Sequence, residues 1–148
     1  MNNAGPFAHG SYGHIEVVEA WQLSYCLGCL TGYLMNAAQK GRSLHDLQRA
    51  QWYVNRAIEH PEIALAGCNF TVSMLIDAEV IANDWFAKDI VLYDAFLYVM
   101  SAVASSRCSF WSLWKGRLWR VERLHDAVVE LEVAKRLLDV AIVNYSSE

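Results

Sequence analysis

Apolar residues recur along most of this chain at the three- and four-residue intervals of amphipathic helices. Only two prolines occur in the 148 residues, so few positions force a helix to end. Residues 1–13 contain three glycines and one proline and predict an irregular arm. The pattern after the arm predicts four helices: about Ile15–Gln39, a helix that starts at Ser43 and Asp46 and stops at Pro61, about Thr71–Trp85, and about Asp89–Ala104.

A longer helical segment, from about Ser109 to Tyr145, ends the chain. Written in heptads, it has apolar residues at eight of ten core-type positions, and Arg117 and Lys135 occupy the other two. The eight apolar positions are Trp114, Val121, Leu124, Val128, Leu131, Leu138, Ile142 and Tyr145. Such a pattern suits helix–helix association, and we expect it to serve half as bundle core and half as subunit interface. The expected fold is therefore all-α: a helical bundle of four to five helices with a long C-terminal helix, in one domain over residues 14–148 that assembles as a homo-oligomer.

Composition bears on whether a membrane or a nucleic acid contacts these helices. The chain is 55% hydrophobic and only 19% charged, with six tryptophans and a net charge of −4. Residues 20–39 carry no charge and approach the length of a membrane span, but their polar side chains disfavour insertion. The acidic balance disfavours DNA as a partner. Because the N-terminus also lacks the basic-then-apolar order of a secretory signal, we expect a cytoplasmic protein that contacts no membrane.

Small residues in the first predicted helix suggest close contacts. Gly28 and Gly32 lie four residues apart, which indicates the close approach of another helix or of a ligand. Cys26 and Cys29 form a C-x-x-C pattern in an apolar helical context, which is typical of buried structural cysteines.

Pairs of acidic and histidine residues resemble parts of metal sites. Glu16 and Glu19 form an E-x-x-E pattern, and His-Asp pairs stand at residues 45–46 and 125–126. Each pair lacks further ligands at the required spacing, so we expect no metal and no cofactor.

One basic window interrupts the acidic chain. Residues 107–123 contain five basic residues and one acidic residue, with Arg117, Arg120 and Arg123 at three-residue spacing and Trp114 among the aromatic residues. Guanidinium groups pair with phosphates and indoles stack on bases, so the window could form a nucleotide-phosphate surface. The alternative, a helix start with solvated arginines and core-anchoring tryptophans, is equally compatible with this pattern.

The stretch from His9 to Ile58 resembles a family of small phage proteins that includes a nucleotide kinase of a short-tailed coliphage. The resemblance rests on matched residues across two helices and the loop between them. These are His9, Ile15-Glu16-Val17-Val18, Gly28, Tyr33-Leu34, Lys40-Gly41, Asp46-Leu47, Ala50 and Tyr53. The sequence departs from the family pattern at three positions: Cys29 replaces an Asn, Gly32 a Lys and Asn36 an Arg.

The resemblance implies a phage-type protein of the host cytoplasm that handles nucleotides. Two cations of the family pattern are absent, and no phosphate-binding Gly-x-x-x-x-Gly-Lys-Ser/Thr loop is present, so we expect binding without turnover. Such a protein would sequester a nucleotide or a nucleotide-derived host immune signal, as an anti-defence sponge. The alternatives are a nucleoside monophosphate kinase and a helical interaction or structural protein. The expected ligand-binding residues are His9, Glu16, Tyr33, Asn36, Lys40, Asp46, Arg49, Trp114, Arg117, Arg120 and Arg123.

Overall fold

The computed structural model describes residues 8–9, 12–39, 44–65, 78–106 and 117–147. A short antiparallel hairpin, β1 (Ala8–His9) and β2 (Tyr12–Gly13), precedes the helices, with Ala8 opposite Gly13 and His9 opposite Tyr12. The expected irregular arm therefore contains a hairpin, whose two-residue strands are too short to produce an alternating pattern. The helices of the described residues are α1 (His14–Trp21), α2 (Tyr25–Gln39), α3 (Leu44–Glu59), α4 (Pro61–Ala64), α5 (Ala78–Trp85), α6 (Ile90–Ser106) and α8 (Arg117–Ser146).

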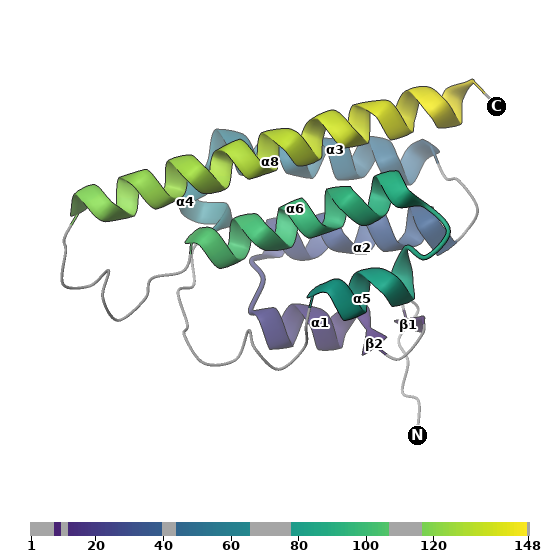
Figure 1. The fold of residues 1–148 in the computed structure, drawn as a ribbon, viewed down its shortest axis with the longest axis horizontal. Coiled ribbons are helices and arrows are strands. Elements are labelled where there is room, and N and C mark those ends of the chain that lie inside the picture. The colour runs from purple at the N-terminus through teal and green to yellow at the C-terminus, as the bar shows by residue number, and fades with distance from the viewer. Residues whose placement is uncertain (1–7, 10–11, 40–43, 66–77, 107–116, 148) are drawn as a thin grey trace.

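Four of these helices form a closed bundle. Helix α2 packs against α3, α3 against α8, α8 against α6, and α6 against α2. The long helix α8 runs the length of the molecule, while α1, α5 and the hairpin lie on the opposite side (Figure 1). The all-α prediction and the long C-terminal helix are thus confirmed. None of the helices in the described ranges has both the length and the apolar character of a membrane span.

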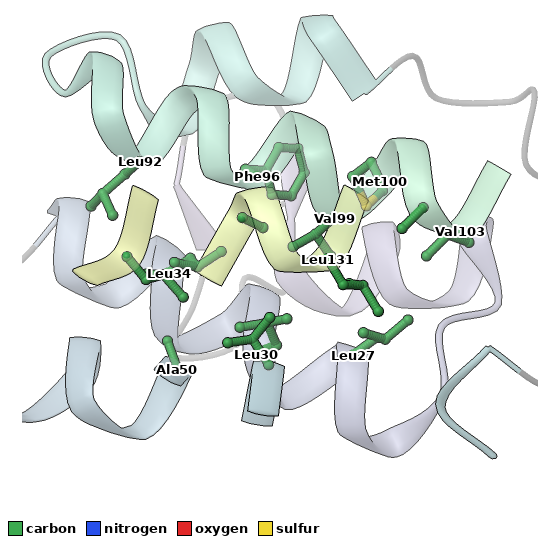
Figure 2. Close-up of a cluster of buried hydrophobic side chains, with 14 of the residues drawn as sticks. Leu27, Leu30, Leu34, Ala50, Leu92, Phe96, Val99, Met100, Val103 and Leu131 are labelled. Atoms are coloured by element: carbon green, nitrogen blue, oxygen red, sulfur yellow. The ribbon is translucent and has the colours of Figure 1, made fainter. Parts of the chain in front are cut away.

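The bundle core consists of aliphatic and aromatic side chains from all four helices. Figure 2 shows the centre of this core, where side chains of α2 and α6 converge on α8. The fully buried members drawn there include Leu27, Leu30, Leu34, Phe96 and Leu131.

The first predicted helix is wrong in one respect, because the chain breaks between α1 and α2. Gln22 adopts a left-handed conformation with φ 49°. The amides of Gln22 and Leu23 donate to the carbonyls of Glu19 (3.2 Å) and Val18 (3.0 Å), which is the bond pattern of a Schellman cap. Ser24 then caps the N-terminus of α2, since its hydroxyl accepts from the amide of Leu27 at 3.2 Å.

The buried face of α8 is displaced from the predicted heptad positions. Leu131 and Leu138 are fully buried, as predicted, but Val128 and Ile142 are only half-buried. Ala127, Ala134 and Ala141 fill the rest of the buried stripe. Their small side chains let α6 and α8 approach closely. Polar contacts join the same pair of helices: Ser101 and Ser105 donate to the two oxygens of Glu130 at 2.7 and 3.1 Å.

Candidate functional site

The two glycines of α2 lie directly beneath α1. His14 and Val18, one turn apart on α1, cover Gly32 and Gly28 respectively. A methyl group at Gly32 would meet His14 Cε1 at 2.9 Å, closer than real carbon contacts, whereas one at Gly28 would meet Val18 Cγ2 at an ordinary 3.6 Å. Close helix packing therefore accounts for the four-residue glycine spacing.

The imidazole of His14 fixes this contact. Its Nε2 lies 2.8 Å from the Gly28 carbonyl oxygen and 3.2 Å from Thr31 Oγ1. Because a carbonyl only accepts, Nε2 carries the proton and donates to Gly28. Burial lowers the pKa of His14 below its ordinary value of 6.5, and the bond to Gly28 offsets only part of this effect. The ring is therefore neutral at physiological pH.

This lowered pKa predicts an acid-sensitive contribution to stability. Below about pH 6.5 the unfolded chain gains a proton on His14 that the folded chain does not, so the free energy of unfolding should fall as the pH falls through this range. His14→Gln keeps a donor for Gly28 but cannot titrate. Urea unfolding between about pH 5 and 8 should show a smaller pH dependence for this variant than for the wild type. Identical pH profiles would contradict the assignment.

A pocket of about 440 Å³ opens between α1 and α2 beside this contact. Most of its wall is carbon, from aliphatic side chains, the two glycines and tyrosine rings. Two residues of the expected site, Tyr33 and Asn36, lie in this wall. Glu16 does not line the pocket: it lies in the first turn of α1, where it accepts from the Gly13 amide at 3.4 Å. Its neighbour one turn later, Glu19, lines the pocket instead.

Asn36 is the polar residue that the apolar wall leaves unsatisfied. Its side chain is only 6% exposed, and its Oδ1 has no hydrogen-bond partner among the described residues. A buried amide oxygen without a donor costs about 1–3 kcal/mol, and the residue that carries this one lines the pocket.

An aromatic and cationic group forms the boundary of the pocket toward α3. The rings of Tyr33 (α2) and Tyr53 (α3) stack with centroids 5.8 Å apart and planes at 19°. The guanidinium carbon of Arg49 lies 5.9 Å from the centre of the Tyr33 ring, within cation–π range. Arg49 and Tyr33, both expected binding residues, are thus brought together.

The cysteines lie at this boundary, and Cys26 also packs against the core. Cys26 and Cys29 are half-buried and carry free thiols. The Cys26 thiol lies 3.3 Å from the Tyr53 carbonyl oxygen, to which it donates. A hydrogen bond between the Tyr53 hydroxyl and Cys29, together with burial, raises the pKa of Tyr53 to about 12. Both cysteines are therefore less buried than expected, because they lie at the junction of α2 and α3.

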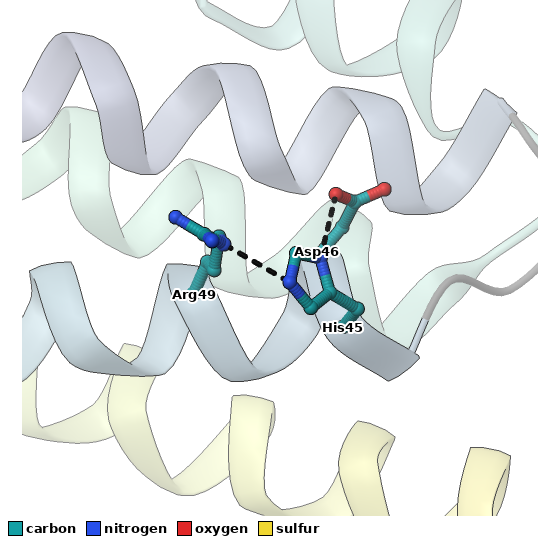
Figure 3. Close-up of polar contacts among 3 residues, drawn as sticks. All are labelled: His45, Asp46 and Arg49. Carbon is teal, nitrogen blue, oxygen red and sulfur yellow. Dashed lines mark hydrogen bonds and ion pairs between the residues drawn. The ribbon is translucent and has the colours of Figure 1, made fainter.

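A second pocket, of about 460 Å³, lies on the outer face of α3 and is lined by His45, Gln48, Arg49, Trp52 and Tyr53. Figure 3 shows three neighbouring polar residues of this face. Arg49 Nε donates to His45 Nε2 at 3.2 Å, and His45 Nδ1 lies 4.0 Å from Asp46 Oδ1. Arg49 is therefore held by a histidine that Asp46, another expected binding residue, contacts from the other side.

The described structure does not place the side chains of the remaining expected residues. Lys40 and Trp114 lie outside the described residues. The backbones of Arg117, Arg120 and Arg123 belong to α8, and that of His9 to β1, but their side chains are outside the described part. The site also contains residues that the sequence did not indicate as ligand-binding, among them His14 and Trp52. Only their spacing in the sequence could have indicated them. Residues 14 and 18 are four residues apart, as are the two glycines, and Trp52 lies three residues after Arg49 on the same helix face.

Within the described ranges, no three His, Cys, Asp or Glu side chains lie close enough together to hold a metal ion. No protein-family model matches this chain, and no curated protein and no solved structure shows significant similarity to it.

Proposed function

We propose that this protein binds a nucleotide or a nucleotide-derived molecule in the pocket between α1 and α2 and releases it chemically unchanged. The observation that supports this most is the Oδ1 of Asn36, which has no hydrogen-bond partner among the described residues and belongs to a mostly apolar wall. A nucleobase is flat, presents an apolar face and carries N–H donors on its edge. It would therefore fill the pocket and supply the hydrogen bond that Asn36 lacks.

The charges at the pocket orient such a ligand. Glu19 lies in the wall on the α1 side, and Arg49 lies over Tyr33 on the α3 side. Glu19 repels a phosphate, whereas the Arg49 guanidinium can donate two parallel hydrogen bonds to it. The phosphate is therefore expected over the Tyr33 edge of the pocket, beside Arg49.

Sequestration is the biological role that this binding mode would serve. The resemblance to phage nucleotide-handling proteins, together with the changes at Cys29, Gly32 and Asn36, supports a phage protein that holds a host signal in the cytoplasm without consuming it. We further propose that it acts as a homo-oligomer. Val129, Val140 and Val143 of α8 are each exposed by more than two fifths in the single chain and offer apolar surface for a second copy.

Isothermal titration with nucleoside monophosphates, cyclic nucleotides and ADP-ribose derivatives tests the proposal. At least one should bind, and Arg49→Gln should weaken that binding about fivefold, the order that an exposed ionic contact supplies. Arg56→Gln is the matched control, because Arg56 is exposed on the same helix and lines neither of the two pockets. Its affinity should equal that of the wild type.

The chemical state of the ligand separates this proposal from the alternatives. Chromatography after incubation with ATP should recover the ligand unchanged. Conversion of a nucleoside monophosphate to its own diphosphate, as ATP becomes ADP, would instead identify a monophosphate kinase. If no member of the panel binds, the nucleotide proposal is wrong, and the interpretation as a helical interaction protein gains support.

A further inference from the structure

The two pockets are joined by a contact between one residue of each. Tyr33 lines the pocket between α1 and α2, and Tyr53 lines the pocket on the outer face of α3. Because these two rings stack on each other, the two pockets adjoin a single aromatic pair. The pockets are also similar in size, at about 440 and 460 Å³. Each is therefore large enough for one aromatic ring system.

One arginine, Arg49, lies at the junction of the pockets. Arg49 lines the outer pocket and also lies over Tyr33, which belongs to the inner one. Among the described residues that line either pocket, no other Lys or Arg occurs. Two separate mononucleotides would bring two phosphates to this one guanidinium, and their like charges would repel. One phosphodiester between two bases brings a single negative charge instead.

The outer pocket offers a free stacking surface for a second base. The Trp52 side chain is 61% exposed, although its ring touches Tyr53 edge-on with centroids 4.9 Å apart. An exposed indole held in place by a neighbouring ring and adjacent to an arginine is a surface on which bases stack.

Resting on the proposed function, we infer that the ligand is a dinucleotide, with one base in the pocket between α1 and α2, the linking phosphodiester at Arg49 and the second base on Trp52. The Asn36 amide oxygen accepts from the first base. The second base is held by stacking, which tolerates any base, so recognition is stricter in the inner pocket than in the outer one.

The test compares two probes, adenylyl-(3′→5′)-adenosine and AMP, by isothermal titration with the full chain. The dinucleotide should bind about tenfold more tightly than AMP, because the second base adds a stacking contact without a separate association step. One dinucleotide should bind per chain. Trp52→Ala should remove this tenfold advantage and leave the affinity for AMP unchanged. Trp52→Phe should restore part of the advantage, because it keeps an aromatic face.

Each other outcome has a distinct meaning. If AMP and the dinucleotide bind equally, the dinucleotide inference is overturned while the nucleotide proposal stands. The same holds if two AMP molecules bind per chain with no gain for the linked form. If the dinucleotide is preferred but Trp52→Ala leaves that preference intact, the placement of the second base is overturned. If neither probe nor any other nucleotide binds, both proposals fail.

Discussion

Replacing Gly32 by valine is expected to lower the free energy of unfolding by about 3 kcal/mol, near the upper end of overpacking costs. A Cβ at this position already lies 2.9 Å from His14 Cε1 and 3.1 Å from Nε2, and valine adds two further methyl groups. The imidazole cannot move aside cheaply, because Nε2 would lose its 2.8 Å contact with the Gly28 carbonyl oxygen. Urea unfolding followed by far-UV circular dichroism measures the loss.

Gly28→Ala is the matched control one turn earlier on the same face of α2. Its new methyl group would meet Val18 at 3.6 Å, an ordinary van der Waals distance. Alanine also favours the helical state over glycine by up to about 1 kcal/mol, so this variant should be neutral or more stable than the wild type. Equal effects of the two substitutions would show that α1 does not pack on α2 through His14.

A helix was predictable from the sequence where nearby residues determine its ends and its buried face. Helix α3 has Asp46 in its first turn and ends before Pro61. Its apolar stripe at Leu47, Ala50 and Val54 is fully buried. These signals lie within one turn of the residues they control, so no knowledge of distant contacts was needed.

The break between α1 and α2 had a weaker local signal. A Schellman cap normally uses glycine at its left-handed position, but here Gln22 occupies it. The available clue was Ser24, a favoured N-cap residue followed by a helical stretch. An uninterrupted helix from Ile15 to Gln39 would carry α1 away from α2, and the pocket between these helices would not form.

Helix α8 shows why a periodic pattern does not by itself select the buried face. Its heptads offer two apolar stripes one position apart, one with Val128 and Ile142, the other with Ala127 and Ala141. Hydrophobicity favours the larger side chains, but close approach to α6 favours alanine. This choice depends on the partner helix, which the sequence pattern does not contain.

The candidate site was predictable only along single helices. Tyr33 and Asn36 lie in one pocket wall because they are three residues apart on α2. The stacking of Tyr33 on Tyr53 joins residues that are 20 positions apart and depends on how α2 and α3 cross. The same limit applies to Glu16, which was expected to bind the ligand. Its carboxylate accepts from the Gly13 amide at the start of α1, whereas Glu19 lines the pocket.

Replacing Asn36 by leucine is expected to change stability and binding in opposite directions. The Oδ1 of Asn36 is buried without a donor among the described residues, so a leucine, which has the same branched shape but two methyl groups in place of the amide, removes an unsatisfied polar atom from a mostly apolar wall. The free energy of unfolding of the unliganded protein should therefore rise by about 1 kcal/mol. Affinity for the nucleotide should fall on the order of thirtyfold, because the base would bury an N–H donor opposite a methyl group.

Ser106→Ala is the matched control for these opposite effects on stability and affinity. Ser106 is also a buried polar residue, 7% exposed, but its hydroxyl donates to the Val103 carbonyl at 2.8 Å. Its removal should lower the free energy of unfolding by about 1 kcal/mol and leave nucleotide affinity unchanged, because the hydrogen bond that is lost belongs to a residue that does not line the pocket. Urea unfolding and isothermal titration on the same preparations give both quantities. If Asn36→Leu behaves like Ser106→Ala and loses stability without losing affinity, Asn36 serves the fold alone and the nucleotide proposal loses its main support.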